Sequence, residues 1–150
     1  MNYKELKEKW IGKKVDFDGV YWNQCVDFAR QAVKDLYGVN IWTFSGSAIN
    51  GWNTGSPFDW KWQRVENSIK AVPPAGSVVF FDKMYRGQKC INPYGHVAIT
   101  GEGCTWRRLV ILEQNAGSGN GNGKWANAIT ERVLDYIRPA RCLGWYILKK

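Results

Sequence analysis

A cysteine and the only histidine of the chain are the residues best suited to covalent chemistry. Cys25 begins a segment with helical periodicity, residues 25–37. A thiol at a helix N-terminus has a lowered pKa and more of the nucleophilic thiolate, and a nearby imidazole would activate it further. The alternative for Cys25 is a small apolar residue of the core, which is the commoner fate of a cysteine.

His96 lies in the first of two consecutive predicted strands. If the strands form a hairpin with Thr100 opposite Leu109, then His96 lies opposite Glu113, with Cβ atoms about 5 Å apart. Asn115 lies two residues beyond Glu113 and therefore shares its face. We expect Glu113 or Asn115 to accept a hydrogen bond from the imidazole and to fix its tautomer.

Acidic residues gather in one short segment of a basic protein. Residues 15–29 hold three acids and no lysine or arginine, although the net charge of the chain is +8. Positions 1, 3, 5, 7 and 12 of a twelve-residue window have the ligand spacing of a calcium loop, although the glycine position and the final aspartate depart from the EF-hand pattern. The residues at these positions are Asp16, Asp18, Val20, Trp22 and Asp27. The segment predicts a Ca²⁺ site that would contain Cys25, the alternative being a solvated acidic turn.

Helices that precede strands must position these residues. The predicted helices cover residues 3–11 and 25–37, with one further turn near 47–51 in a segment, 39–76, that otherwise reads as loop. The predicted strands, rich in β-branched and aromatic residues, are 77–83, 94–100, 109–115, 131–137 and 143–149. This order predicts an α+β fold with N-terminal helices packed on an antiparallel sheet.

Composition limits the partners of the chain. With 150 residues, 45% of them apolar and 23% charged, it is long enough for one globular domain with a real core. The charge of +8 favours polyanions such as nucleic acid, an anionic membrane or an anionic cell wall. The sequence has no basic recognition helix and no apolar run of about 18 residues, so we expect neither nucleic acid nor membrane as partner.

Two further groups of residues are expected to have mainly structural roles. Cys90, Cys104 and Cys142 match no compact zinc motif and are expected to be buried free thiols. The tryptophans at positions 52, 60 and 62 are either a ligand platform or, more often for such residues, core and loop packing.

Three segments, YWNQCVDFARQ, YGHVAIT and VILEQNA, together resemble the CHAP family of cysteine- and histidine-dependent amidohydrolases/peptidases. They look most like the catalytic domains of bacteriophage endolysins, and the resemblance runs from Lys7 to the end of the chain. It implies a papain-like fold and a single CHAP catalytic domain over residues 1–150. Phage lysins of this family usually carry a separate wall-binding domain, and in a departure from that pattern we expect none here. It also implies that the substrate is the peptidoglycan of an anionic Gram-positive wall.

The resemblance implies a role for each site residue. Cys25 would be the nucleophile, His96 the general base and then acid, Glu113 the residue that orients His96, and Asn115 a polar helper. Tyr94 matches a position where the family often carries an aromatic residue on the substrate groove. In the calcium-binding subset of the family, Ca²⁺ would be held by the carboxylates of Asp16, Asp18 and Asp27 and the carbonyls of Val20 and Trp22.

The expected function is therefore hydrolysis of an amide bond of the cell wall by an endolysin endopeptidase. An N-acetylmuramoyl-L-alanine amidase with the same machinery is the alternative within this class. The alternative from another class is a non-enzymatic, calcium-dependent wall-binding module. The N-terminus has lysine and glutamate where a signal peptide is apolar, so we expect a protein made in the host cytoplasm that acts on the cell wall, the alternative being a secreted or released lysin. We also expect a monomer.

Overall fold

The computed structural model describes the chain except residues 18, 20–23, 42–46, 56, 115–127 and 139. Its helices are α1 (Tyr3–Trp10), α2 (Cys25–Tyr37) and α3 (Ala48–Thr54). Its strands are β1 (Trp62–Glu66), β2 (Val78–Phe81), β3 (Met84–Arg86), β4 (Lys89–Asn92), β5 (His96–Thr100), β6 (Leu109–Glu113), β7 (Thr130–Leu134) and β8 (Cys142–Leu148).

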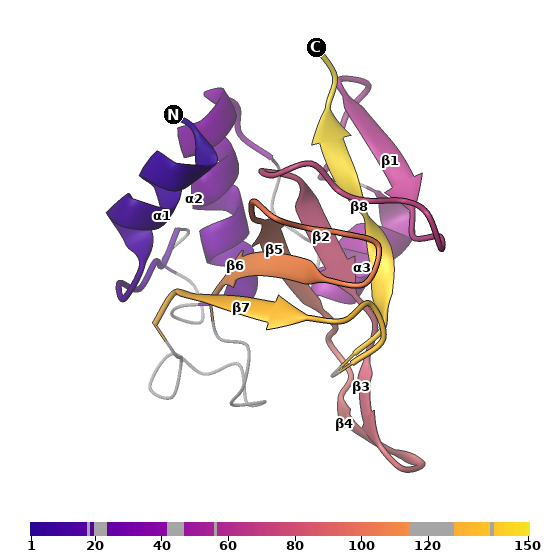
Figure 1. Ribbon diagram of the computed structural model, residues 1–150. Coiled ribbons are helices and arrows are strands. Elements are labelled where there is room, and N and C mark those ends of the chain that lie inside the picture. Colours follow the sequence, from indigo (N-terminus) through magenta and orange to yellow (C-terminus); the bar gives the residue numbers. More distant parts are fainter. Residues whose placement is uncertain (18, 20–23, 42–46, 56, 115–127, 139) are drawn as a thin grey trace.

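Six of the strands form one antiparallel sheet with the order β1-β8-β2-β5-β6-β7. The other two, β3 and β4, form a separate hairpin that projects from the body of the molecule (Figure 1). This hairpin connects the end of β2 to the start of β5 and so leaves the sheet beside His96. Helices α1 and α2 lie together on one side of the sheet (Figure 1). The predicted α+β fold is confirmed.

Helix α2 carries the apolar stripe that fixes it against the sheet. Phe28, Ala29, Ala32 and Val33 recur at helical spacing and are fully buried, and the helix packs mainly on β5. Gly38 ends the helix in the left-handed conformation, with φ 69°, which favours glycine. Helix α2 therefore places Cys25, its first residue, at the end of the sheet where β5 begins.

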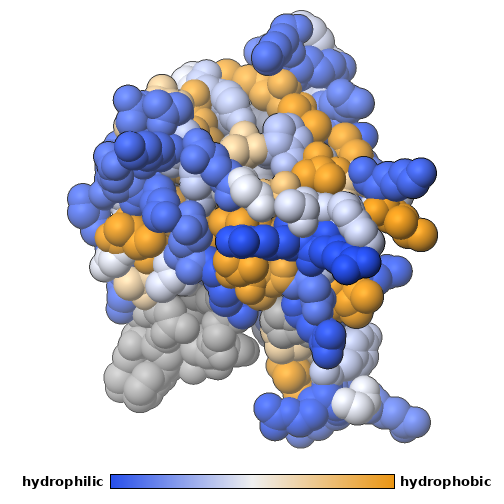
Figure 2. All heavy atoms as spheres, viewed as in Figure 1, coloured by the Kyte–Doolittle hydropathy of each residue, from blue (hydrophilic) through white to orange (hydrophobic). Residues whose placement is uncertain are grey.

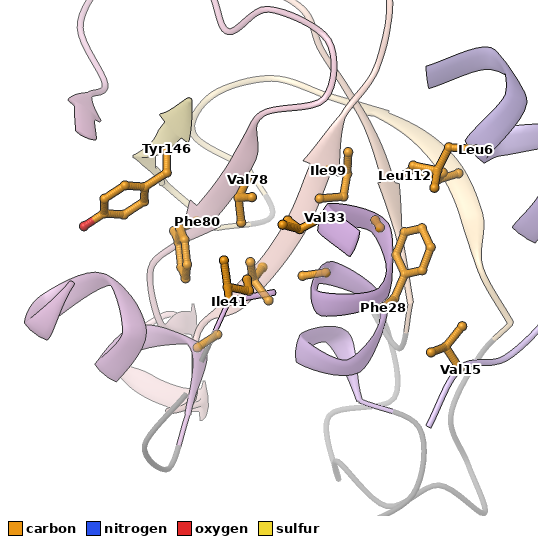
Figure 3. Close-up of a cluster of buried hydrophobic side chains, with 14 of the residues drawn as sticks. Leu6, Val15, Phe28, Val33, Ile41, Val78, Phe80, Ile99, Leu112 and Tyr146 are labelled. Carbon is orange, nitrogen blue, oxygen red and sulfur yellow. The ribbon is translucent and has the colours of Figure 1, made fainter. Parts of the chain in front are cut away.

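The main core fills the space between the helices and the sheet. Figure 3 shows Phe28 of α2 beside Leu112 of β6, and Val33 beside Ile99 of β5. A second cluster covers the opposite face of the sheet and includes Trp145. The face of the molecule seen in Figure 2 carries many hydrophilic residues, with apolar residues between them. Both faces of the central strands are thus buried, which holds the start of β5 and the end of β6 in a fixed relation.

All five predicted strands are present, with bounds that differ from the prediction by one to three residues, and so are the predicted helices. Strand β1 and the β3–β4 hairpin were not predicted. The β1 sequence, WQRVE, has only its first residue buried because it is an edge strand, and the hairpin residues are largely exposed. Neither segment therefore has the apolar run or alternation that identifies a strand of the core.

The remaining cysteines and tryptophans divide between core and surface. All four cysteines are free, and Cys142 is buried as predicted. Cys90 is exposed, contrary to prediction, because it lies on the projecting hairpin. Trp52 and Trp62 pack in the core, whereas Trp60 is 78% exposed. Among the described residues, no helix has the length and apolar character needed to span a membrane.

Candidate active site

Cys25 and His96 meet where α2 and β5 both begin. Cys25 is half-buried, and its side chain is hydrogen-bonded to His96. Gly95, directly before His96, has φ 67°, and a Cβ there would lie 2.7 Å from the Phe81 carbonyl oxygen. Glycine is therefore required at this close turn into β5. The His96 ring packs 5.9 Å from the Phe81 ring, which limits its orientation.

Glu113 contacts the other side of the imidazole. The His96 Nε2 atom lies 2.8 Å from Glu113 Oε2, and the Glu113 side chain is only 1% exposed. Because Nε2 is directed to Glu113, the Nδ1 atom is left to face Cys25. The three side chains thus form the chain Cys25–His96–Glu113, with the thiol nearest to solvent.

The predicted pairing of β5 with β6 is wrong by two residues. Thr100 pairs with Ile111 rather than with Leu109, so His96 lies diagonal to Glu113 instead of opposite. Side chains in a strand alternate with a period of two, and a shift of two residues keeps both side chains on one face. The expected contact between His96 and Glu113 therefore survives the change of register.

Arg132, which the sequence analysis missed, binds the same carboxylate. Its Nε lies 2.5 Å from Glu113 Oε1 and its Nη2 lies 3.3 Å from Glu113 Oε2. The residue falls in the predicted strand 131–137, but nothing in the sequence shows how that strand aligns with β6. In the structure, Arg132 pairs with Ile111, two residues from Glu113 and on the same face.

The electrostatics of the three charged groups are mutually dependent. Burial raises the pKa of Glu113, but hydrogen bonds and charge attraction from His96 and then Arg132 outweigh it and lower this pKa below its usual range. Burial lowers the pKa of His96, but the hydrogen bond and charge of Cys25, followed by those of Glu113, raise it from 6.5 to about 10. The arrangement favours an imidazolium held between the Cys25 sulfur and the Glu113 carboxylate.

Gln114, the next residue in the chain, ties the Cys25 loop to the sheet. It is fully buried, and its side-chain amide donates to the carbonyls of Val15 and Gln24, at 2.7 and 2.9 Å. Its amide oxygen accepts the Val15 N–H at 2.6 Å. Glu113 and Gln114 therefore hold, respectively, the histidine and the residue before Cys25. Gln114 falls within the segment VILEQNA, and nothing in the sequence alone indicates a role for it.

The described part of the acidic loop contains two of the predicted calcium ligands. Asp16 is exposed and accepts the Gly19 N–H at 2.9 Å. Asp27 is buried, and its carboxylate accepts the N–H groups of Phe17 and Gln24, at 3.2 and 2.8 Å. Because Phe17 directly follows Asp16, its hydrogen bond to Asp27 connects the first predicted ligand to the last.

The fit of this loop to Ca²⁺ can be judged from these two carboxylates. Both are hard oxygen donors of the kind that Ca²⁺ prefers, and they come from the two ends of one loop. The described residues hold no group of three or more histidine, cysteine or acidic side chains that could bind a metal. The predicted ligands Asp18, Val20 and Trp22 lie outside the described residues.

The two remaining predicted site residues are placed differently. Asn115 lies outside the described residues. Tyr94 is 58% exposed, and its carbonyl accepts the Ile49 N–H at 2.9 Å. Its backbone is therefore fixed two residues before His96, while its ring faces solvent.

A cavity of about 590 Å³ lies between α3, β1 and the segments that follow β2 and precede β8, and neither Cys25 nor His96 lines it. Two of its lining residues come close to the start of β5. Ile49 lies against the backbone of Gly95, and Asp82 directly follows Phe81, the strand partner of His96. Its polar lining includes Glu66, Asp82, Lys83, Tyr85 and Arg141. The described lining holds charges of both signs, which suits a zwitterionic or peptide-like group.

Comparison with known proteins places the chain in a family. One solved structure with a similar fold, the crystal structure of a wild type endolysin LysIME-EF1, gives a TM-score of 0.73 at 21% sequence identity. The alignment covers 100% of this chain and 66% of the endolysin chain, so the protein spans somewhat less than two thirds of that relative. No curated protein matches the sequence. The CHAP domain family matches residues 15–115, which include Cys25, His96 and Glu113, and the chain belongs to this family.

Proposed function

We propose that the protein is a peptidoglycan hydrolase that cleaves an amide bond by cysteine nucleophilic catalysis. The observation that carries the proposal is the contact chain Cys25–His96–Glu113, in which a buried carboxylate orients an imidazole that contacts a thiol. A nucleophile, a base within hydrogen-bonding reach and a third group that orients the base are the parts that acyl transfer requires.

Each residue has a defined step in this mechanism. The Cys25 thiolate attacks the amide carbonyl, and the N–H of Cys25 at the start of α2 helps to stabilise the oxyanion. The His96 imidazolium gives its proton to the leaving amine as the C–N bond breaks. His96 then takes a proton from water, which attacks the thioester and releases the Cys25 thiolate. Glu113 remains ionised throughout and keeps His96 in the required tautomer.

Three observations support peptidoglycan as the substrate. The chain carries a net charge of +8, which favours an anionic wall. Its fold resembles that of an endolysin. The cavity that Ile49 and Asp82 line offers charged groups of both signs, which suits a wall peptide with amino and carboxylate groups. We favour the endopeptidase reaction, with the muramoyl amidase reaction as the alternative, and we place Tyr94 on the substrate groove.

We further propose that the acidic loop binds Ca²⁺. Asp16, Asp18 and Asp27 would supply carboxylates, and Val20 and Trp22 would supply carbonyls. When bound, the ion would neutralise the clustered acids and stiffen the loop. Asp27 lies two residues after Cys25 and bonds the N–H of Gln24, so the loop conformation is coupled to the position of the thiol. The remaining proposals are a monomeric CHAP catalytic domain over residues 1–150 and action at the cell wall.

The competing class is a calcium-dependent module that binds the wall without cutting it. Such a module could retain the fold and the charge, but it would not need the buried ion pair that orients His96. The exposed position of Tyr94 and the adjacent cavity suit either class. Covalent reactivity of Cys25 is therefore the property that separates them.

Lysis of purified Gram-positive cell walls tests the proposal. The wild-type protein should reduce turbidity, whereas Cys25→Ala and His96→Ala should not; Cys90→Ala, which removes an exposed thiol on the hairpin, is the matched control. Mass spectrometry of the released fragments distinguishes endopeptidase from amidase ends. Full activity in either site variant would refute the mechanism. Wall binding without any fragment release by the reduced protein with Ca²⁺ would favour the binding module.

A further inference from the structure

Glu113 receives two cationic groups from neighbouring strands. His96 approaches from β5 through Nε2, and Arg132 approaches from β7 through Nε and Nη2. These two are the charged groups that face the carboxylate in the described structure, and Cys25 of α2 lies beyond the imidazole. Arg132 is 37% exposed, whereas Glu113 is 1% exposed. The guanidinium thus closes the solvent side of the buried carboxylate.

The two cations differ in a way that matters for proton transfer. When His96 gives up its proton, the imidazole becomes neutral. If His96 were the only partner of Glu113, this step would leave the carboxylate as a buried charge without a cation beside it. An uncompensated buried carboxylate is costly and tends to take up a proton instead. The guanidinium of Arg132 cannot lose its proton in a protein, so its charge compensates Glu113 throughout the cycle.

We propose that Arg132 is a positioning residue that keeps Glu113 ionised and directed at His96 while His96 loses and regains its proton. This inference rests on the proposed function, in which His96 transfers protons. Arg132 contacts neither Cys25 nor His96 through any described hydrogen bond, so its effect passes through Glu113. The two-point contact fixes the plane of the carboxylate, which a single ammonium cannot do.

NMR titration tests this role without any substrate. His96 is the only histidine in the chain, so its Cε1–H signal identifies itself and senses protonation of Glu113 nearby. The chemical shift of this signal should change at acidic pH, where Glu113 takes up a proton. In Arg132→Gln, this inflection of the titration curve should move to higher pH, because one of the two groups that lower the pKa of Glu113 is gone. Arg132→Lys should give an intermediate shift. The control, Arg138→Gln, removes an exposed arginine that pairs with Asp135, and it should titrate like wild type.

Kinetics provide the second measurement. Arg132→Gln should lower the rate of Cys25 alkylation by iodoacetamide and lower kcat for wall hydrolysis roughly tenfold, a fraction of the 10²–10⁴-fold that general acid–base catalysis contributes. KM should be unchanged. Glu113→Gln/Arg132→Gln should match Glu113→Gln alone, because Arg132 acts through Glu113.

Several outcomes would overturn the inference. One is a folded Arg132→Gln variant in which the inflection at acidic pH and the rate of Cys25 alkylation are those of the wild type. Another is a double variant in which the loss of rate caused by Glu113→Gln and the loss caused by Arg132→Gln add. If Arg132→Gln does not fold, Arg132→Lys decides, since it keeps the charge, and wild-type behaviour of that variant would exclude a role for the two-point contact. A titration shift in Arg132→Gln together with no hydrolysis by the wild type would refute the proposed function and leave the positioning role standing.

Discussion

The side-chain nitrogen of Gln114 lies 2.9 Å from the carbonyl oxygen of Gln24, the residue before Cys25. Gln114 directly follows Glu113, so two consecutive residues at the end of β6 fix the two partners of the candidate site. Glu113 holds His96, and Gln114 holds the backbone that leads into α2. The distance between thiol and imidazole is thus set by one short stretch of backbone.

Replacement of Gln114 by leucine should destabilise the protein and displace Cys25. The change leaves the Val15 N–H and the carbonyls of Val15 and Gln24 without their partner, and each buried polar group so orphaned costs about 1–3 kcal/mol. A loss of about 3 kcal/mol corresponds to a fall in Tm of roughly 6–12 °C for a domain of this size. The exposed Gln88→Leu, measured by the same thermal unfolding, should change Tm little. Equal Tm values for both variants would disprove that the hydrogen bonds of Gln114 to the Val15 and Gln24 backbone stabilise the protein.

The charge of His96 should persist to unusually high pH. Its pKa is raised to about 10, so the imidazolium and the stability that it contributes are fully present below pH 6.5 and are lost as the pH rises through about 10. Wall hydrolysis should decline over the same range. Titration of the single histidine signal by NMR measures this directly. Cys25→Ala and Glu113→Gln should each lower the pKa, and a wild-type value near 6.5 would contradict the described ion pairs.

Cys25 should react with iodoacetamide faster than the exposed Cys90. Exposure alone would favour Cys90, so a higher rate at Cys25 requires activation by its surroundings. Peptide mapping by mass spectrometry gives the rate at each thiol, with the buried Cys142 as the slow reference. His96→Ala should remove the advantage of Cys25 and leave the Cys90 rate unchanged. A Cys25 rate at or below that of Cys90 in the wild type would argue for the non-enzymatic binding module.

The sequence predicted those features that depend on local pattern. The helix at residues 25–37 has a continuous apolar stripe and a glycine stop, so its bounds are recovered without error. The contact between His96 and Glu113 was predicted through an incorrect strand register, and it held because the error was an even number of residues. Alternation along a strand thus determines the face of a side chain more securely than its direct partner.

Other features depend on contacts between distant segments and carry no local signal. Arg132 meets Glu113 only because β7 pairs with β6 in one register, and 16 residues separate these strands along the chain. The role of Gln114 depends on the Val15 backbone, which lies beside it in the fold but 99 residues away in the chain. A buried amide or ion pair between strands therefore has to be found in three dimensions.

Ca²⁺ should stabilise the protein against heat through the acidic loop. A ligand that binds only the folded state adds about 2.7 kcal/mol at a concentration of 100 Kd. Differential scanning calorimetry with added CaCl₂ should show a rise in Tm that EDTA reverses. Asp16→Asn should abolish this rise, since Asp16 would supply a carboxylate to the ion. Asp59→Asn is the matched control, because Asp59 is also exposed and, like Asp16, accepts a backbone N–H that follows it closely in the chain, that of Lys61. If Ca²⁺ raises the Tm of Asp16→Asn as much as that of wild type, the ion binds elsewhere and the loop is a solvated acidic turn.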